Sequence, residues 1–129
     1  ANALFELRKA KGMTIEKAKE LLLNETYLGM MIVKQGDADG LVSGAYHSTA
    51  DTLRPALQIL KTAPNTKLVS SFFVMIVPNC SYGENGIFVF SDCGLVEKPN
   101  AEELAEIAKS SSKSFEQLIG KPAKVAMLS

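Results

Sequence analysis

Apolar residues recur every three or four positions in four stretches of the chain, which is the pattern of helices that pack one face against a core. The predicted helices cover residues 2–10, a segment capped by Thr14, a segment capped by Asp51 or Thr52, and a segment from Asn100 to about Gly120. Glu103 follows Asn100 by three residues, which predicts a capping box at the start of the last helix. Much of the chain is therefore expected to be amphipathic helix.

Residues 27–35 are almost wholly apolar, so the spacing of apolar and polar positions does not distinguish a buried strand from a buried helix. Lys34-Gln35-Gly36 has the composition of a helix end, with glycine just beyond the last turn. We therefore predict a short buried helix in this segment.

Short apolar segments between turn residues predict strands. They are residues 41–43, 68–77, 87–90 and 125–128. Asn85-Gly86 predicts a tight turn between the second and third of these. Because helices and strands alternate, the predicted fold class is α/β, with helices packed on a mixed sheet in three layers. The turn signal at residues 63–66 predicts a boundary between one unit at 1–65 and another at 66–129.

The segment from Asp37 to Thr62 is the densest group of candidate ligands. Its loop is rich in small and hydroxyl residues, and Pro55 is expected in the first turn of the following helix, where proline is tolerated. Arg54 would then lie in that first turn. A cation at a helix N-terminus is unfavourable unless an anion joins it, and a guanidinium suits phosphate or carboxylate oxygens. On spacing alone, solvation of Arg54 or its pairing with Asp51 is the favoured interpretation.

The same segment resembles the signature region of phosphate acetyltransferases, also called phosphotransacetylases. The matching residues read Asp-Ala-Asp-Gly-Leu-Val-Ser-Gly-Ala at 37–45 and His-Ser-Thr-Ala-Asp-Thr-Leu-Arg-Pro-Ala-Leu-Gln-Ile at 47–59. Further similarity lies in residues 6–14, 89–94, 101–108 and 124–129, so that the resemblance spans nearly the whole chain. The run from His47 to Pro55 distinguishes acetyltransferases from phosphate butyryltransferases and from the C-terminal domain of some malic enzymes.

The resemblance implies parts of two α/β lobes of a phosphotransacetylase-like fold, which is similar to that of isocitrate dehydrogenase, and a homodimer. The implied reaction is reversible acetyl transfer between coenzyme A and phosphate, with acetyl-CoA and acetyl phosphate as substrates and no separate cofactor or metal. Arg8 and Arg54 match arginines that hold the phosphoryl group in the family's active site, and this match favours a ligand role for both. Ser43, Gly44 and Ser48 are candidates for the phosphate pocket on their chemistry alone.

The family's catalytic aspartate, and the serine and arginine near it, belong to a later segment that this chain lacks. We therefore expect the chain to be a fragment of a longer enzyme, to bind phosphate weakly by itself and to be inactive. Two alternatives remain open: a phosphate butyryltransferase-like acyltransferase, and a non-catalytic module for acyl-CoA binding or oligomerisation.

Composition narrows the remaining classes of protein. The 129 residues carry 14 basic and 14 acidic side chains, and no basic stripe with interleaved aromatics predicts a nucleic-acid partner. No apolar run is long enough to span a membrane. Cys80 and Cys93 are too few for a disulfide scaffold, and we expect reduced thiols in a cytoplasmic protein.

Other polar residues allow more than one role. His47 is the only histidine and has no nucleophile motif beside it, which favours loop ordering over general-base catalysis. Asp37 and Asp39 are too few for a metal site and suit a turn. Asp92 ends a predicted strand, where either a turn or a functional role is possible.

Overall fold

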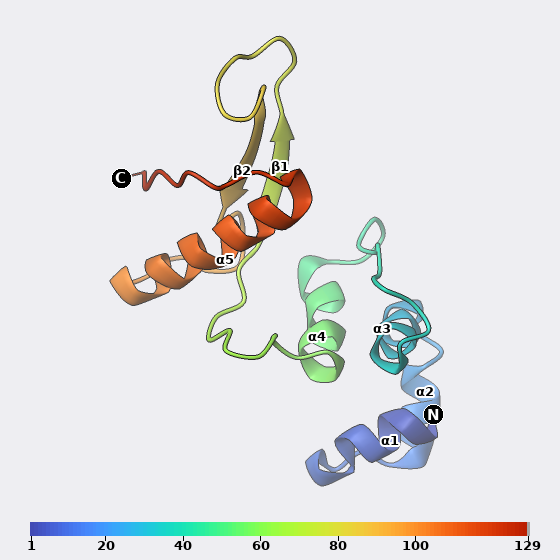
Figure 1. The fold of residues 1–129 in the computed structure, drawn as a ribbon. Coiled ribbons are helices and arrows are strands. Elements are labelled where there is room, and N and C mark those ends of the chain that lie inside the picture. Colours follow the sequence, from blue (N-terminus) through green and yellow to red (C-terminus); the bar gives the residue numbers. More distant parts are fainter. Residues whose placement is uncertain (129) are drawn as a thin grey trace. The chain divides into compact units, whose positions relative to one another are not determined.

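The computed structural model describes residues 1–128, which divide into two compact units. The first unit runs from Ala1 to Lys61 and the second begins at Thr62. Helices make up the regular structure of the first unit, whereas a hairpin and one long helix make up that of the second (Figure 1). The predicted α/β class is confirmed.

The helices of the first unit are α1 (Asn2–Arg8), the 3₁₀ turn η1 (Lys9–Lys11), α2 (Ile15–Leu21), α3 (Glu25–Gln35) and α4 (Thr49–Ile59). Their ends follow the local sequence. Thr14 caps α2 through a hydrogen bond from the N–H of Lys17, and Asn24 caps α3. Gly36 ends α3 in the left-handed conformation that glycine adopts readily. The prediction of a helix rather than a strand for residues 27–35 is confirmed.

Each of the four α-helices contributes to the core of the first unit. The buried apolar residues are Leu4, Ala18, Met30, Met31 and Ile59. Helix α3 packs against α4, and α1 against α2. Burial of a side chain of this size stabilises the fold by about 1.5–3 kcal/mol, so these few residues account for much of the packing energy of the unit.

Helix α4 begins three or four residues earlier than the prediction that made Asp51 or Thr52 its cap. Ser48 is the cap, and its Oγ accepts a hydrogen bond from the N–H of Asp51 at 3.2 Å. Pro55 therefore lies inside the helix, where a proline costs about 3 kcal/mol. Its ring is buried, and we infer that this burial offsets part of the cost.

The predicted strand at residues 41–43 is wrong, because this segment is irregular in the structure. A strand needs a neighbour to pair its backbone N–H and C=O groups, and no strand of residues 1–61 is available. Leu41 instead packs beside Gly29 of α3. The segment is therefore part of a loop that runs from Asp37 to the cap of α4.

The second unit contains β1 (Phe72–Ile76), β2 (Ile87–Ser91) and α5 (Ala101–Ile119). The two strands form an antiparallel hairpin in which Phe72 pairs with Ser91 and Ile76 with Ile87. Helix α5 packs against β2, and the capping box predicted for Asn100 and Glu103 is present. Gly120 ends α5, as its sequence indicated.

The sheet of the described chain is this hairpin alone, and it has no parallel strand. The predicted strand at 68–77 is shorter than expected, and the predicted strand at 125–128 is wrong, because residues 122–128 have no regular structure. Every residue of β1 is exposed, so the hairpin lacks the neighbours that a larger mixed sheet would provide. Both cysteines are free thiols, as expected. No helix within residues 1–128 has the length and apolar composition needed to cross a membrane.

Candidate functional site

Arg8 lies at the wall of a cavity of about 260 Å³ within the first unit. Each of the five helical elements contributes one long polar or basic side chain to this cavity. These side chains belong to Arg8, Lys11, Lys17, Tyr27 and Gln58. Three of them are cations and none of the lining residues is a carboxylate, so the cavity is suited to an anion.

One nitrogen of Arg8 has a structural partner. Nη1 donates a hydrogen bond to the backbone oxygen of Gln58 at 3.1 Å. Because α4 ends at Ile59, this oxygen is one of the last four carbonyls of the helix, which lack an intrahelical donor. Arg8 is also the last residue of α1, so its charge lies at the C-terminal ends of two helices, where cations are favoured. Arg8 therefore caps α4.

Another nitrogen of Arg8 has no such partner. Nε is buried and forms no hydrogen bond with any residue in the described part of the chain. An unpaired buried donor costs about 1–3 kcal/mol, and more when the group is charged. An oxygen of phosphate or carboxylate is the kind of acceptor that such a donor needs. The hydroxyl of Tyr27 donates to Oε1 of Gln58 at 3.3 Å and connects α3 to α4 at the same cavity.

Arg54 lies in the second turn of α4 rather than in the first, because the helix begins at Thr49. It is exposed, and no ion pair involving Arg54 is formed within residues 1–128. Asp51, its expected partner on spacing alone, accepts a hydrogen bond from the hydroxyl of Ser48 at 2.6 Å. Of the two alternatives that spacing favoured, the pairing of Arg54 with Asp51 is absent and Arg54 is exposed to solvent, so the guanidinium is available to a ligand.

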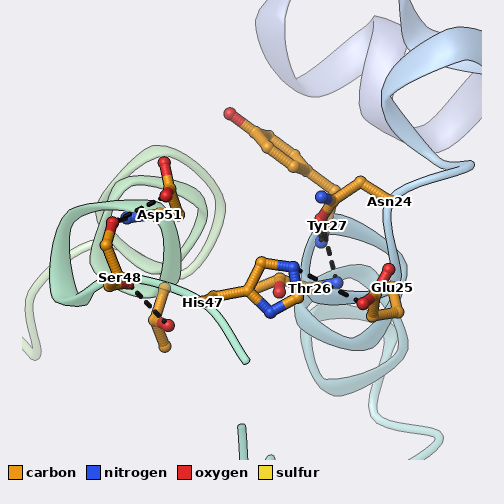
Figure 2. Close-up of polar contacts among 8 residues, drawn as sticks. Asn24, Glu25, Thr26, Tyr27, His47, Ser48 and Asp51 are labelled. Carbon is orange, nitrogen blue, oxygen red and sulfur yellow. Dashed lines mark hydrogen bonds and ion pairs between the residues drawn. The ribbon is translucent and has the colours of Figure 1, made fainter. Parts of the chain in front are cut away.

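Ser43 and Gly44 belong to the loop before α4 and line a second cavity of about 290 Å³. Glu25 and His47 lie at the same cavity, where Nε2 of His47 is 3.4 Å from Oε1 of Glu25. Figure 2 shows the His47 side chain extending from the loop to the first turn of α3. The ring of Tyr46 meets that of His47 nearly at a right angle, with 5.7 Å between centroids. His47 thus makes a contact of the kind that a loop-ordering role requires.

The five candidate residues lie in three places. Arg8 lines the first cavity, Ser43 and Gly44 line the second, and Arg54 and Ser48 lie on or beside α4 outside both. The hydroxyl of Ser48 is engaged with the backbone and side chain of Asp51 as a helix cap. The first unit therefore presents the candidate residues without enclosing them in one pocket.

Sequence reasoning did not identify the residues that surround Arg8. Lys11 belonged to a basic run in which spacing did not distinguish one cation from another. Lys17 had the pattern of an exposed helix face. Tyr27 and Gln58 are 31 positions apart and meet only because α3 packs on α4, which no local pattern indicates.

Asp92 forms a polar cluster in the second unit, directly after β2. Its carboxylate accepts hydrogen bonds from Oγ of Ser71 at 2.6 Å and from the N–H groups of Gly94 at 2.7 Å and Leu95 at 3.0 Å. Burial acts to raise the pKa of this carboxyl, but these hydrogen bonds together outweigh it and lower the pKa below its usual value. Asp92 therefore organises a turn as a charged acceptor.

We expect Asp92→Asn to lower the free energy of unfolding by about 1–3 kcal/mol at a pH of about 7, because the substitution removes a charged acceptor. A carboxyl with a lowered pKa stabilises the fold above its usual pKa, and this contribution is lost as the pH falls through the folded-state pKa. The deficit of the variant should therefore shrink as the pH falls below about 4. Urea unfolding of the full-length protein at a pH of about 7 and again below about 4 measures this deficit. Glu97→Gln is the control, because Glu97 is exposed. An equal deficit at both pH values would show that the charge of Asp92 is not responsible.

A cation-lined cavity in an α/β protein is typical of a class that binds anionic small molecules. The chain belongs to the phosphate acetyl/butaryl transferase family, whose model matches residues 1–129. Phosphate acetyltransferase of Acetivibrio thermocellus is 68% identical over all 129 residues, and that of Thermoanaerobacterium thermosaccharolyticum is 60% identical. In both cases the match covers 100% of this chain and 39% of the relative. The chain thus spans about two fifths of the length of these relatives.

A solved structure supports the same relationship. The crystal structure of a phosphotransacetylase from Streptococcus pyogenes is 46% identical and superimposes with a TM-score of 0.83. The match covers 98% of this chain and 37% of that structure. The local fold described above therefore matches that of a segment of the Streptococcus pyogenes phosphotransacetylase.

Proposed function

We propose that this chain is the part of a phosphate acetyltransferase that supplies two phosphate-binding arginines, Arg8 and Arg54. The complete enzyme would transfer an acetyl group reversibly between coenzyme A and phosphate, with both thioester and acyl phosphate as substrates. The relatives named phosphate acetyltransferase support this reaction, since they match the chain over its whole length. Membership of a family that also includes butyryl transferases leaves the acyl chain length to be tested.

One observation supports the proposal most directly: Arg8, whose buried Nε has no hydrogen-bond partner among the described residues, lines a cavity with three cationic side chains and no carboxylate. A phosphoryl group needs several donors and compensating positive charge, and Arg8, Lys11 and Lys17 offer both. Arg54 is unpaired among the described residues and would contribute from α4. Ser43, Gly44 and Ser48 remain candidates for the phosphate pocket.

The proposed chemistry is an acyl transfer between sulfur and oxygen. The thiol of coenzyme A attacks the carbonyl carbon of acetyl phosphate, a C–S bond forms, the C–O bond to phosphate breaks, and the thiol proton passes to a general base. The resemblance assigns that base to a later segment of the full-length enzyme. The role left to the arginines is to hold the phosphoryl group and to stabilise the negative charge that develops on it.

The proposal extends to assembly and location. We propose a homodimeric, cytoplasmic enzyme, as the family resemblance implies, with coenzyme A as a substrate rather than a bound cofactor. Two free thiols are consistent with a reducing compartment.

We expect the full-length protein to form acetyl-CoA from acetyl phosphate and coenzyme A, and the 129-residue segment alone to show no turnover. The reason is that the segment carries the phosphate-binding arginines but lacks the base. Thioester formation measured side by side on both proteins checks this, and calorimetry with inorganic phosphate checks for weak binding by the segment. Substantial turnover by the segment would contradict the division of roles. A clear preference of the full-length protein for butyryl phosphate would favour the butyryltransferase, and no acyl transfer at all would favour a non-catalytic module.

A further inference from the structure

The loop that carries Ser43 and Gly44 is attached to one face of α3 at two points. At one end, Leu41 lies so close to Gly29 that a Cβ added there would be 2.9 Å from Cδ1 and 3.0 Å from Cδ2 of the leucine. At the other end, His47 contacts Glu25. Residues 25 and 29 are one helical turn apart and share a face of α3. The loop from Leu41 to His47 therefore follows this face of the helix.

Gly29 has no local reason to be glycine. It lies inside α3, its backbone is not left-handed, and glycine is less favourable than alanine inside a helix. The three nearest atoms that a methyl carbon at this position would meet all belong to the Leu41 side chain. Gly29 is thus the residue that permits the close approach of the loop to the helix.

The loop also approaches α4. Gly44 has a φ of +112°, and a Cβ there would lie 3.6 Å from Oγ1 of Thr52. The backbone at Ser43 and Gly44 is therefore set between the contacts with α3 and the start of α4. A shift at Leu41 would be transmitted through a single intervening residue to Ser43.

We propose that Gly29 and Leu41 are positioning residues, which place the loop of Ser43 and Gly44 so that its backbone and hydroxyl groups bind the phosphoryl group of the substrate. This inference rests on the proposed function, in which that loop belongs to the phosphate pocket. The other end of the loop is held by the contact between Nε2 of His47 and the carboxylate of Glu25. The α3 face thereby determines the geometry of a binding loop without touching the ligand.

The test is Gly29→Ala in the full-length enzyme. A methyl group at this position favours helix formation but overlaps Cδ1 of Leu41, so the leucine side chain must turn away from α3 and the contact that holds this end of the loop is lost. We expect the KM for phosphate to rise between about threefold and about tenfold, while kcat/KM for coenzyme A stays nearly unchanged. This rise is smaller than the loss of about a hundredfold in rate that a displacement of a whole ångström can cause. The thermal midpoint should stay the same or rise. A purely structural role would move the midpoint and leave the KM for phosphate unaltered.

Leu41→Ala provides a second variant and a rescue. Alone, it removes the side chain that rests on Gly29 and should also raise the KM for phosphate. Combined with Gly29→Ala, it makes room for the added methyl group, so the double variant should be less impaired than the product of the two single effects predicts. Gly40→Ala is the matched control, because a Cβ at Gly40 meets no atom within 4 Å.

The outcomes separate the inference from the function on which it rests. An inactive wild-type enzyme would overturn the proposed function. An active wild-type enzyme whose Gly29→Ala variant keeps its KM for phosphate would overturn the positioning role alone. Independent effects of the two substitutions in the double variant would likewise show that Gly29 and Leu41 do not act through their contact.

Discussion

Replacing Arg8 by glutamine in the full-length enzyme is expected to lower kcat/KM for acetyl phosphate by about 10²–10³-fold, the usual cost of removing one donor from a site of developing negative charge. It should also destabilise the protein by about 1–2 kcal/mol, because Nη1 caps the C-terminus of α4 through the backbone oxygen of Gln58. Steady-state kinetics and urea unfolding of the same preparation measure both effects. Arg8 is thus expected to be both a ligand and part of the scaffold.

Two further variants separate these roles. Arg8→Lys keeps the charge but lacks the planar fork, so it should recover much of the stability and little of the activity. Lys9→Gln is the matched control, since Lys9 is the next cation along the chain, is exposed and pairs with Glu6 outside the cavity. If Arg8→Gln lost only stability, the capping of α4 would be its whole function.

Replacing Arg54 by glutamine is expected to lower kcat/KM by about a hundredfold and to leave the free energy of unfolding within about 0.5 kcal/mol of wild type. The reason is that Arg54 is exposed and forms no ion pair within the described chain, so that its loss removes no contact that stabilises the fold. Kinetics with phosphate as the varied substrate, together with thermal unfolding, tests this expectation. The contrast with Arg8 is the informative part: one arginine should affect both activity and stability, the other activity alone.

Lys34→Gln is the control for Arg54, because it removes an exposed cation of α3 that lies at neither cavity. It shows how much of any loss comes from net charge alone. A fall in stability with Arg54→Gln would mean that the residue has a structural partner in the full-length enzyme. Unchanged kinetics would remove Arg54 from the phosphate site.

Helix boundaries were the part of the fold that could be predicted well. Thr14 and Asn100 were recognised as caps, and Gly36 and Gly120 as helix ends, because these effects involve neighbours within one turn. The start of α4 was predicted three or four residues late. The rule that places proline in the first turn was outweighed by the cap at Ser48 and by the burial of the Pro55 ring against the core.

Strands were predicted less well, for a reason that is also physical. A strand is stable only when another strand pairs with its backbone, and such pairing depends on partners far away in the sequence. Residues 41–43 and 125–128 have apolar composition but no paired neighbour in the described chain. Residues 87–90 have a partner in β1, and their predicted strand is confirmed.

The candidate site, like the fold, was determined partly by local sequence and partly by contacts between distant segments. The sequence by itself determined the helices, the caps at Thr14 and Asn100, the α/β class, and, through its motif, the family and the choice of Arg8 and Arg54 as candidates. Only the tertiary structure showed that Arg8 caps α4, that Lys11, Lys17, Tyr27 and Gln58 surround it, and that Leu41 rests on Gly29. Local signals act within a few residues, whereas these contacts join helices up to 50 positions apart and arise from packing around a shared core.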